Sequence, residues 1–132
     1  MTIPQDSRTC IDLHCHSTAS DGALSPEALI ARAVEQGVSH LALTDHDTIA
    51  GLEVARGAAS GSGLSLINGV ELSCVWRSHT IHVVGLDFDE RDPAFLTSLE
   101  RQNESRWQRA RMIADRLSRL NVDQLLERAT KV

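Results

Sequence analysis

The sequence predicts an α/β domain built on a mostly parallel sheet. Three observations carry this prediction. Apolar strand patterns alternate with helical patterns, cap and stop signals bound the helical patterns, and polar residues of the kind that bind metals follow the strands. At 132 residues the chain can form one domain, but it is short for a closed eight-stranded α/β barrel, which needs roughly 200 to 250 residues.

Composition and charge argue against several classes of protein. Hydrophobic residues make up 42% of the chain and charged residues 23%, which is ordinary for a globular protein and not for a disordered or fibrous one. The net charge of −5 gives no global reason to expect nucleic-acid or membrane binding. No segment resembles a signal peptide or a membrane span. Cys10, Cys15 and Cys74 form no CxxC pair, so we expect reduced core cysteines and a cytoplasmic protein.

The first strand is expected at residues 11–16 and the first helix at residues 26–36. The strand alternates apolar and polar side chains, as expected with one apolar face. The helix has Ser25 as its N-cap, Pro26 at its first position and Gly37 as its stop signal. Apolar residues recur along the helix at helical spacing and should pack against the sheet: Leu29, Ile30, Ala33 and Val34.

A second strand and a second helix follow in the same order. Residues 40–44 are mostly apolar, as in a parallel strand that is covered on both faces. Asp47 or Thr48 can cap a helix that runs to about Ala59. The order strand, helix, strand, helix is typical of a parallel sheet.

The chain then forms a hairpin. Residues 64–72 read as a third strand, the extended pattern continues to Trp76, and residues 80–86 return with alternating polarity. We place His79 in the turn and His82 on the returning strand.

The longest helix begins at Asp92 and Pro93 and is expected to run to about Leu120, with a short amphipathic helix at residues 123–129. One side of the long helix carries an apolar stripe, and the other faces carry arginines interrupted by acidic residues. We interpret the arginine-rich side as a solvated surface rather than a phosphate-binding one.

Imidazoles and carboxylates gather after three consecutive strands. His14 and His16 share one face of the first strand, and Asp21 follows a short polar loop. His46 follows the second strand, and Glu71 lies near the end of the third. Because the carboxyl ends of parallel strands meet at one rim, these side chains should converge on a polynuclear metal site. The alternative for His-x-His alone is a half-buried strand with two hydrogen-bonded histidines.

This combination of ligand types suggests both a metal and a reaction. Imidazoles and carboxylates without thiolates suit Zn, Mn or Fe, and abundant oxygen ligands favour Mn or Fe. Glu71 could bridge two ions, and a pair of ions about 3.5 to 4 Å apart can hold a hydroxide nucleophile while polarising a phosphoryl group. We expect Asp12 to orient a histidine, Asp45 or Asp47 to orient His46, and His40 to be structural.

Four motifs, in order and spacing, resemble those at the start of the polymerase and histidinol phosphatase (PHP) family: DLHCHSTASDG, LALTDHDT, NGVEL and IHVVGL. They cover about residues 9–90. The resemblance implies a distorted (β/α)7 barrel, with residues 1–132 forming its N-terminal and incomplete part. It also implies up to three divalent ions, with manganese most typical.

The resemblance further implies which residues bind these ions. The ligands would be His14, His16 and Glu71 at the first metal, Glu71 and His82 at the second, and Asp21 and His46 at the third. Glu71 and His82 would take part in catalysis through the bound metals.

Members of the family most similar to this pattern hydrolyse phosphoesters of nucleotides. They remove the 3′-phosphate of nucleoside 3′,5′-bisphosphates or degrade short RNA from its 5′ end. The family's later motifs, a His-Pro and an Asp-x-His, have no counterpart here, so the resemblance leaves open whether the 132 residues act alone or need ligands from elsewhere.

Two other functions stay open. One is a non-catalytic metal-binding or interaction domain. The other is an amidohydrolase-like enzyme, although this class usually needs a lysine late in another strand and the chain has only Lys131. A half barrel would also leave a sheet edge open, so self-association is expected.

Overall fold

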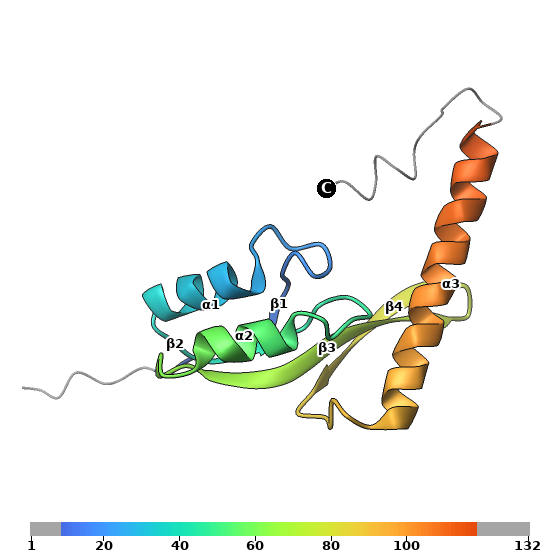
Figure 1. Ribbon diagram of the computed structural model, residues 1–132. Helices are drawn as coiled ribbons and strands as arrows, with labels where there is room; N and C mark the ends of the chain where they lie inside the picture. Colours follow the sequence, from blue (N-terminus) through green and yellow to red (C-terminus); the bar gives the residue numbers. More distant parts are fainter. Residues whose placement is uncertain (1–8, 119–132) are drawn as a thin grey trace, which may run out of the picture. The chain divides into compact units, whose positions relative to one another are not determined.

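The computed structural model describes residues 9–118 and has a four-stranded sheet as its framework (Figure 1). The strands are β1 (Cys10–Cys15), β2 (Val38–Leu43), β3 (Ser65–Trp76) and β4 (His79–Leu86), and they lie in this order across the sheet. The first three strands are parallel, and β4 runs antiparallel to β3. This confirms the predicted parallel sheet and its hairpin.

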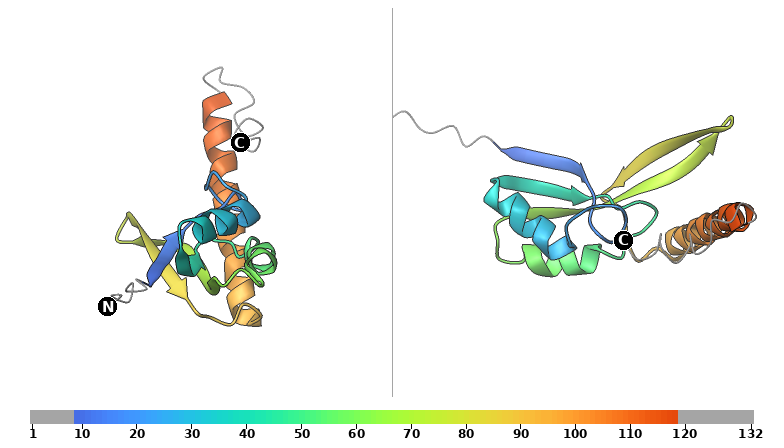
Figure 2. Two further views of the ribbon diagram at one scale, coloured as in Figure 1. Left: turned by 90° about the vertical axis from the view of Figure 1, so that its left-hand side faces the viewer. Right: turned by 90° about the horizontal axis from the view of Figure 1, so that it is seen from above.

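Two helices, α1 (Pro26–Glu35) and α2 (Leu52–Ala59), lie side by side on one face of the sheet, as Figures 1 and 2 show. The core lies between these helices and the middle of the sheet. All three residues of the segment 41–43 are buried, in agreement with the apolar run predicted for β2, which is an inner strand of the sheet. The buried core residues are Ile30, Ala33, Leu41, Leu43, Leu52, Ala55, Ala59 and Leu64.

The two helix starts differ in how well the sequence predicts them. At α1, the Ser25 hydroxyl accepts a hydrogen bond from the Ala28 N–H, as predicted for an N-cap. The predicted cap of α2 is wrong, because that helix begins only after Gly51 and has no side-chain cap. The Asp47 carboxylate instead accepts the main-chain N–H of Ser73 at 2.7 Å. Asp47 therefore joins the loop to β3 rather than starting the helix.

The hairpin turn is tighter than predicted. β3 continues without a break to Trp76, and the turn consists of Arg77 and Ser78, with φ angles of 46° and 69°. Two consecutive residues with positive φ match the right-handed twist of the flanking strands. His79 therefore begins β4, and its predicted place in the turn is wrong.

Some residues expected in the core are exposed among the described residues. On β1, Ile11 is 56% and Leu13 41% exposed, because this strand lies at the edge of the sheet. Cys10 is exposed as well, so the expectation of a core cysteine is wrong there. Val34 is also exposed, since α1 turns Ile30 and Ala33 toward the core.

The described residues 91–118 belong to a second unit, separate from the sheet and its two helices, and α3 (Pro93–Ser118) is its described element. The Asp92 carboxylate accepts the Phe95 N–H at 2.8 Å, which fits the predicted helix start. Leu99 is buried, whereas Trp107 and other residues of the apolar stripe are exposed. The predicted helix end at Leu120 and the short helix after it lie outside the described residues. In the described part of the chain, no helix has the length and apolarity that a membrane crossing requires.

Candidate metal centre

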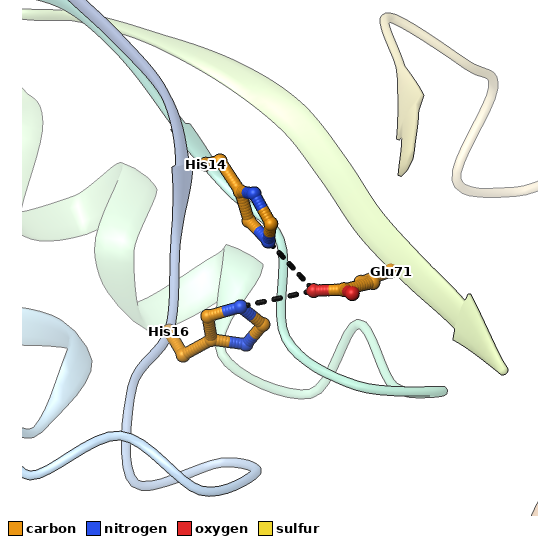
Figure 3. A group of neighbouring side chains, drawn as sticks. All are labelled: His14, His16 and Glu71. Atoms are coloured by element: carbon orange, nitrogen blue, oxygen red, sulfur yellow. Dashed lines mark hydrogen bonds and ion pairs between the residues drawn. The ribbon is translucent and has the colours of Figure 1, made fainter. Parts of the chain in front are cut away.

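The carboxylate of Glu71 lies at the centre of the predicted site. Glu71 is on β3 and is only 6% exposed. Figure 3 shows that His14 and His16, from the end of β1 and the residues just after it, both point at the same carboxylate oxygen. Oε2 lies 2.7 Å from His14 Nε2 and 3.0 Å from His16 Nε2. The alternation in the first strand therefore correctly predicted that these two histidines point the same way.

Two further imidazoles approach Glu71 from other elements. His82 on β4 has its Nδ1 at 3.1 Å from Glu71 Oε1, so both oxygens of the carboxylate face histidines. His46 follows β2, pairs with Glu71 through an isolated parallel bridge, and has its Nε2 at 3.8 Å from Oε2. Side chains from all four strands, or from the residues that follow them, thus converge on one carboxylate. Glu71 itself lies within β3 and not near its end as predicted, because β3 continues to Trp76.

Asp21 approaches the same group of histidines from the loop after β1. Its Oδ1 lies 3.5 Å from His16 Nδ1, and its Oδ2 lies 3.7 Å from His46 Nε2. The Asp21 side chain is 68% exposed, unlike that of Glu71. The two acids therefore mark a buried and an open side of one cluster.

All six predicted metal ligands belong to this cluster. Three sets of side chains each bring their donor atoms within 4.8 Å of one another: His14, His16 and Glu71; His16, Asp21 and His46; and His46, Glu71 and His82. The rings of His16 and His46 stack with centroids 4.7 Å apart. The convergence is as predicted, while the ligand role of each residue stays a prediction.

The electrostatics of the cluster favour an ionised Glu71. Burial alone raises the pKa of this carboxyl, but the hydrogen bond from His14 and the charges of the neighbouring imidazoles outweigh burial and hold the pKa below its usual value. An ionised carboxylate offers both oxygens as acceptors, and this is the form that binds cations.

The donor atoms of the cluster fit a divalent metal ion. His46 Nε2 faces both acids but lies 3.7 Å from Asp21 Oδ2 and 3.8 Å from Glu71 Oε2, which is too far for a hydrogen bond to either. A ring nitrogen of a neutral imidazole that faces carboxylates without bonding to them is a metal donor. Imidazoles combined with carboxylates suit Zn, Mn or Fe.

Cys15 does not belong to the donor set. Its thiol donates to the Ala42 carbonyl at 3.2 Å. Burial raises the pKa of this thiol to about 12, and the negative charges of Asp12 and Asp45 add to the rise. A protonated thiol is a poor ligand, which agrees with the place of Cys15 on the opposite face of the strand.

The neighbouring carboxylates do not act as the sequence suggested. Asp12 accepts the main-chain N–H of His14 at 3.1 Å and has no described contact with an imidazole ring. Asp45 binds Ser17 and Ser20 rather than His46. Asp12 therefore binds the main chain of β1, and Asp45 binds the loop after it.

The role of Ser17 and Ser20 was missed in the sequence. The available signal was the run of hydroxyl residues between His16 and Asp21, which reads as an ordinary polar loop. His40, by contrast, lies at the other end of β2 with its Nδ1 at 3.0 Å from Ser39 Oγ, as expected for a structural residue.

Relatives of this chain include proteins that act on nucleotides or RNA. The chain is 51% identical over 123 residues to the 5′-3′ exoribonuclease Rnm of Escherichia coli, and the matched region covers 92% of this chain and 42% of that protein. It is 48% identical over 103 residues to the 3′,5′-nucleoside bisphosphate phosphatase of Chromobacterium violaceum, covering 78% and 36%. The chain thus spans about two fifths of the length of these curated relatives.

Solved structures and a family profile agree with these relatives. A structure described as an amidohydrolase from Chromobacterium violaceum matches with a TM-score of 0.84 at 42% identity, covering 92% of this chain and 43% of the other. A candidate metal-dependent phosphoesterase from Bifidobacterium adolescentis matches with a TM-score of 0.78 at 29% identity, covering 85% and 39%. The profile described as PHP domain matches residues 12–128. The described strands therefore correspond to part of the barrel that the motifs predict.

Proposed function

Because this chain belongs to the PHP domain family, we propose that it supplies part of the catalytic site of a metal-dependent phosphoesterase. The observation that carries the proposal is the buried Glu71 carboxylate, which has imidazoles on both of its oxygens. A carboxylate placed among histidines from different strands is suited to hold more than one divalent cation.

Six residues would hold the ions in three sites: His14, His16 and Glu71; Glu71 and His82; and Asp21 and His46. Manganese is the ion we propose first, with zinc or iron as alternatives, since the donors combine nitrogen and oxygen. Bound divalent ions would polarise the phosphoryl group and lower the pKa of water, so that a nucleophile forms near neutral pH. Glu71 and His82 contribute to catalysis by fixing the positions of these ions.

The substrate we propose is a nucleotide phosphoester. Two relatives support this choice, one named for the hydrolysis of nucleoside 3′,5′-bisphosphates and one for the degradation of RNA from the 5′ end. We therefore expect either a 3′-phosphate on a nucleoside bisphosphate or the 5′ end of a short RNA.

Metal analysis of the purified chain tests the ligand assignment. We expect the 132-residue chain to bind one or two Mn²⁺ or Zn²⁺ ions weakly, and His14→Ala or Glu71→Ala to abolish this binding. His40→Ala is the matched control, because this histidine is exposed and lies at the opposite end of β2. Unchanged metal content in His14→Ala and Glu71→Ala would count against the site.

Hydrolysis of a nucleoside 3′,5′-bisphosphate tests the activity. The chain alone is compared with the same chain joined to the C-terminal part of the Escherichia coli exoribonuclease, from the end of the matched region onward. We expect manganese-dependent release of phosphate only from the joined protein, because the described residues include no counterpart of the family's later ligands. Full turnover by the 132 residues alone would show that the remaining ligands come from another source, such as a second subunit.

A non-catalytic metal-binding domain is the second candidate. The observation that favours it is that the cluster brings together donor groups sufficient for metal binding, and metal binding does not by itself require hydrolysis. Metal binding without hydrolysis in the joined protein would support this candidate. The amidohydrolase alternative has less support, since the described residues include no lysine that could act as the usual one of that class.

We also propose a cytoplasmic location and self-association of this chain. On the hairpin, Val75 is 73% and Trp76 61% exposed, which leaves an apolar surface free among the described residues. Sedimentation velocity over a range of protein concentrations would show self-association as a rising mean mass. A constant monomer mass would contradict it.

A further inference from the structure

Asp45 is a buried carboxylate beside the candidate metal centre. It is not among the proposed metal ligands, yet it makes several hydrogen bonds to the loop that carries one of them. It is 2% exposed and directly precedes His46. Its Oδ1 accepts hydrogen bonds from the Ser17 N–H at 2.7 Å and the Ser20 hydroxyl at 2.6 Å, and its Oδ2 accepts one from the Ser17 hydroxyl at 2.7 Å. Short bonds to an ionised acceptor are among the stronger hydrogen bonds in proteins.

The serines bound to Asp45 belong to the loop that carries Asp21. Within this loop, the Ser17 carbonyl accepts the N–H groups of Ser20 at 3.0 Å and Gly22 at 2.9 Å. Gly22 lies so close to the preceding strand end that a Cβ atom there would be 2.2 Å from the His16 carbonyl oxygen. The loop is therefore closed on itself, packed on His16, and attached to the second strand through Asp45.

The main chain of Asp45 makes a second connection. Its carbonyl accepts the N–H of Glu71 at 3.1 Å. One residue thus joins the loop after β1 through its side chain and β3 through its main chain, while His46 follows it directly. Asp45 thus connects segments from β1, β2 and β3, three of the four strands that contribute to the cluster.

We propose that Asp45 is a positioning residue that holds His16 and Asp21 at the right distance from His46, acting through Ser17 and Ser20. This inference rests on the proposed function, since the set of residues that it positions is the proposed third metal site together with His16. Asp45 itself is not a ligand in this proposal, because the hydroxyl and main-chain N–H groups of the loop occupy both of its oxygens.

Replacing Asp45 by asparagine tests this role. Asparagine keeps the size of the side chain but removes the charge and replaces one acceptor oxygen by an NH₂ group, which cannot accept from the Ser17 hydroxyl. Residues that orient metal ligands typically change metal affinity by 10- to 100-fold. We therefore expect the Zn²⁺ concentration that half-saturates His46 to rise at least about tenfold in Asp45→Asn.

The measurement is a Zn²⁺ titration of the 132-residue chain, followed by the ¹H–¹⁵N signals of the individual imidazole rings. We expect the signals of His82 to saturate near the wild-type concentration, while those of His46 and His16 lag behind. A purely structural role would shift all rings together. Equal weakening at all rings, or no change at His46, would overturn the inference.

Ser20→Ala is the second variant, and it keeps the test valid if Asp45→Asn does not fold. It removes the hydroxyl of a partly exposed residue, which lies 2.6 Å from Asp45 Oδ1 and 3.3 Å from Asp21 Oδ1. We expect the half-saturating Zn²⁺ concentration of His46 to rise roughly two- to tenfold, because the hydroxyl links Asp45 to the ligand Asp21. An unchanged His46 in a folded Ser20→Ala would contradict the proposal.

Two matched control variants show whether a change in Zn²⁺ binding comes from the loop bound by Asp45 or from any substitution of the same kind. Asp87→Asn changes an exposed acid to its amide at a positive φ of 53°, which asparagine tolerates. Ser39→Ala removes a hydroxyl at the other end of β2. Both controls should titrate like wild type. If the wild-type imidazoles do not respond to Zn²⁺, the proposed function fails; if they respond and Asp45→Asn behaves like wild type, only the present inference fails.

Discussion

Replacing Gly69 by alanine tests how closely β2 and β3 must approach to form the metal centre. A Cβ at this position would lie 2.5 Å from the Leu43 carbonyl oxygen and 2.7 Å from Thr44 Cγ2, and real Cβ atoms essentially never come nearer than 3.0 Å. The two strands would have to separate by about 0.5 Å at this point, the difference between 3.0 and 2.5 Å. Because the contact is with main chain, no side chain can turn away to relieve it.

The expected cost follows from overpacking. Extra volume in a packed region costs about 1 to 3 kcal/mol. The lower entropy of alanine in the unfolded chain offsets about 0.4 to 1 kcal/mol of this. Because the clash is with main chain, we expect the upper part of this range, about 2 to 3 kcal/mol, and therefore a net loss of about 1 to 2.5 kcal/mol in the free energy of unfolding. For a chain of this size that corresponds to a fall in Tm of roughly 4 to 10 °C.

Thermal unfolding followed by far-ultraviolet circular dichroism measures this change, and Gly57→Ala is the matched control. Gly57 lies within α2, and a Cβ there would meet nothing within 4 Å. Alanine in a helix interior stabilises by about 0.5 to 1 kcal/mol relative to glycine, so the control should raise Tm by roughly 2 to 4 °C. A Gly69→Ala protein as stable as wild type, beside a stabilised Gly57→Ala, would refute the reasoning.

Three further predictions concern single residues. Iodoacetamide at pH 8 should label the exposed Cys10 well before Cys15, because a pKa of about 12 keeps the Cys15 thiol protonated at that pH. Labelling of Cys15 should rise only as the pH approaches 12. Peptide mass mapping after timed labelling checks this, and equal labelling rates for the two cysteines would contradict it. Ser25→Ala should lower the free energy of unfolding by about 0.5 to 2 kcal/mol through loss of the N-cap, whereas Ser25→Asp should retain most of the stability in the same urea titration. Leu52→Ala should cost about 2 to 5 kcal/mol, because the side chain is buried between helix and sheet, and a loss below 1 kcal/mol in urea would place Leu52 outside the core.

Local signals were sufficient for most of the fold. The serine cap before α1, the apolar run of β2 and the alternation in β4 each reflect preferences of a short stretch of backbone, so they can be read without knowing the neighbours. Asp47 shows where this fails. As a capping residue type it predicted a helix start, but its carboxylate binds the main chain of Ser73, which is 26 residues away. Short-range patterns carry no information about such a partner.

For the candidate site, too, some features could be predicted from the sequence and others only from the tertiary structure. By itself the sequence determined which residues carry metal-binding groups and that they should meet, because side chains at the carboxyl ends of neighbouring parallel strands share one rim. Only the tertiary structure decided that Glu71 takes histidines on both oxygens and that Asp45 holds the loop beside it. The physical reason is that distances between strands depend on pairing register and on how closely backbones approach, as at Gly69. These are properties of residues far apart in the chain, and no local pattern encodes them.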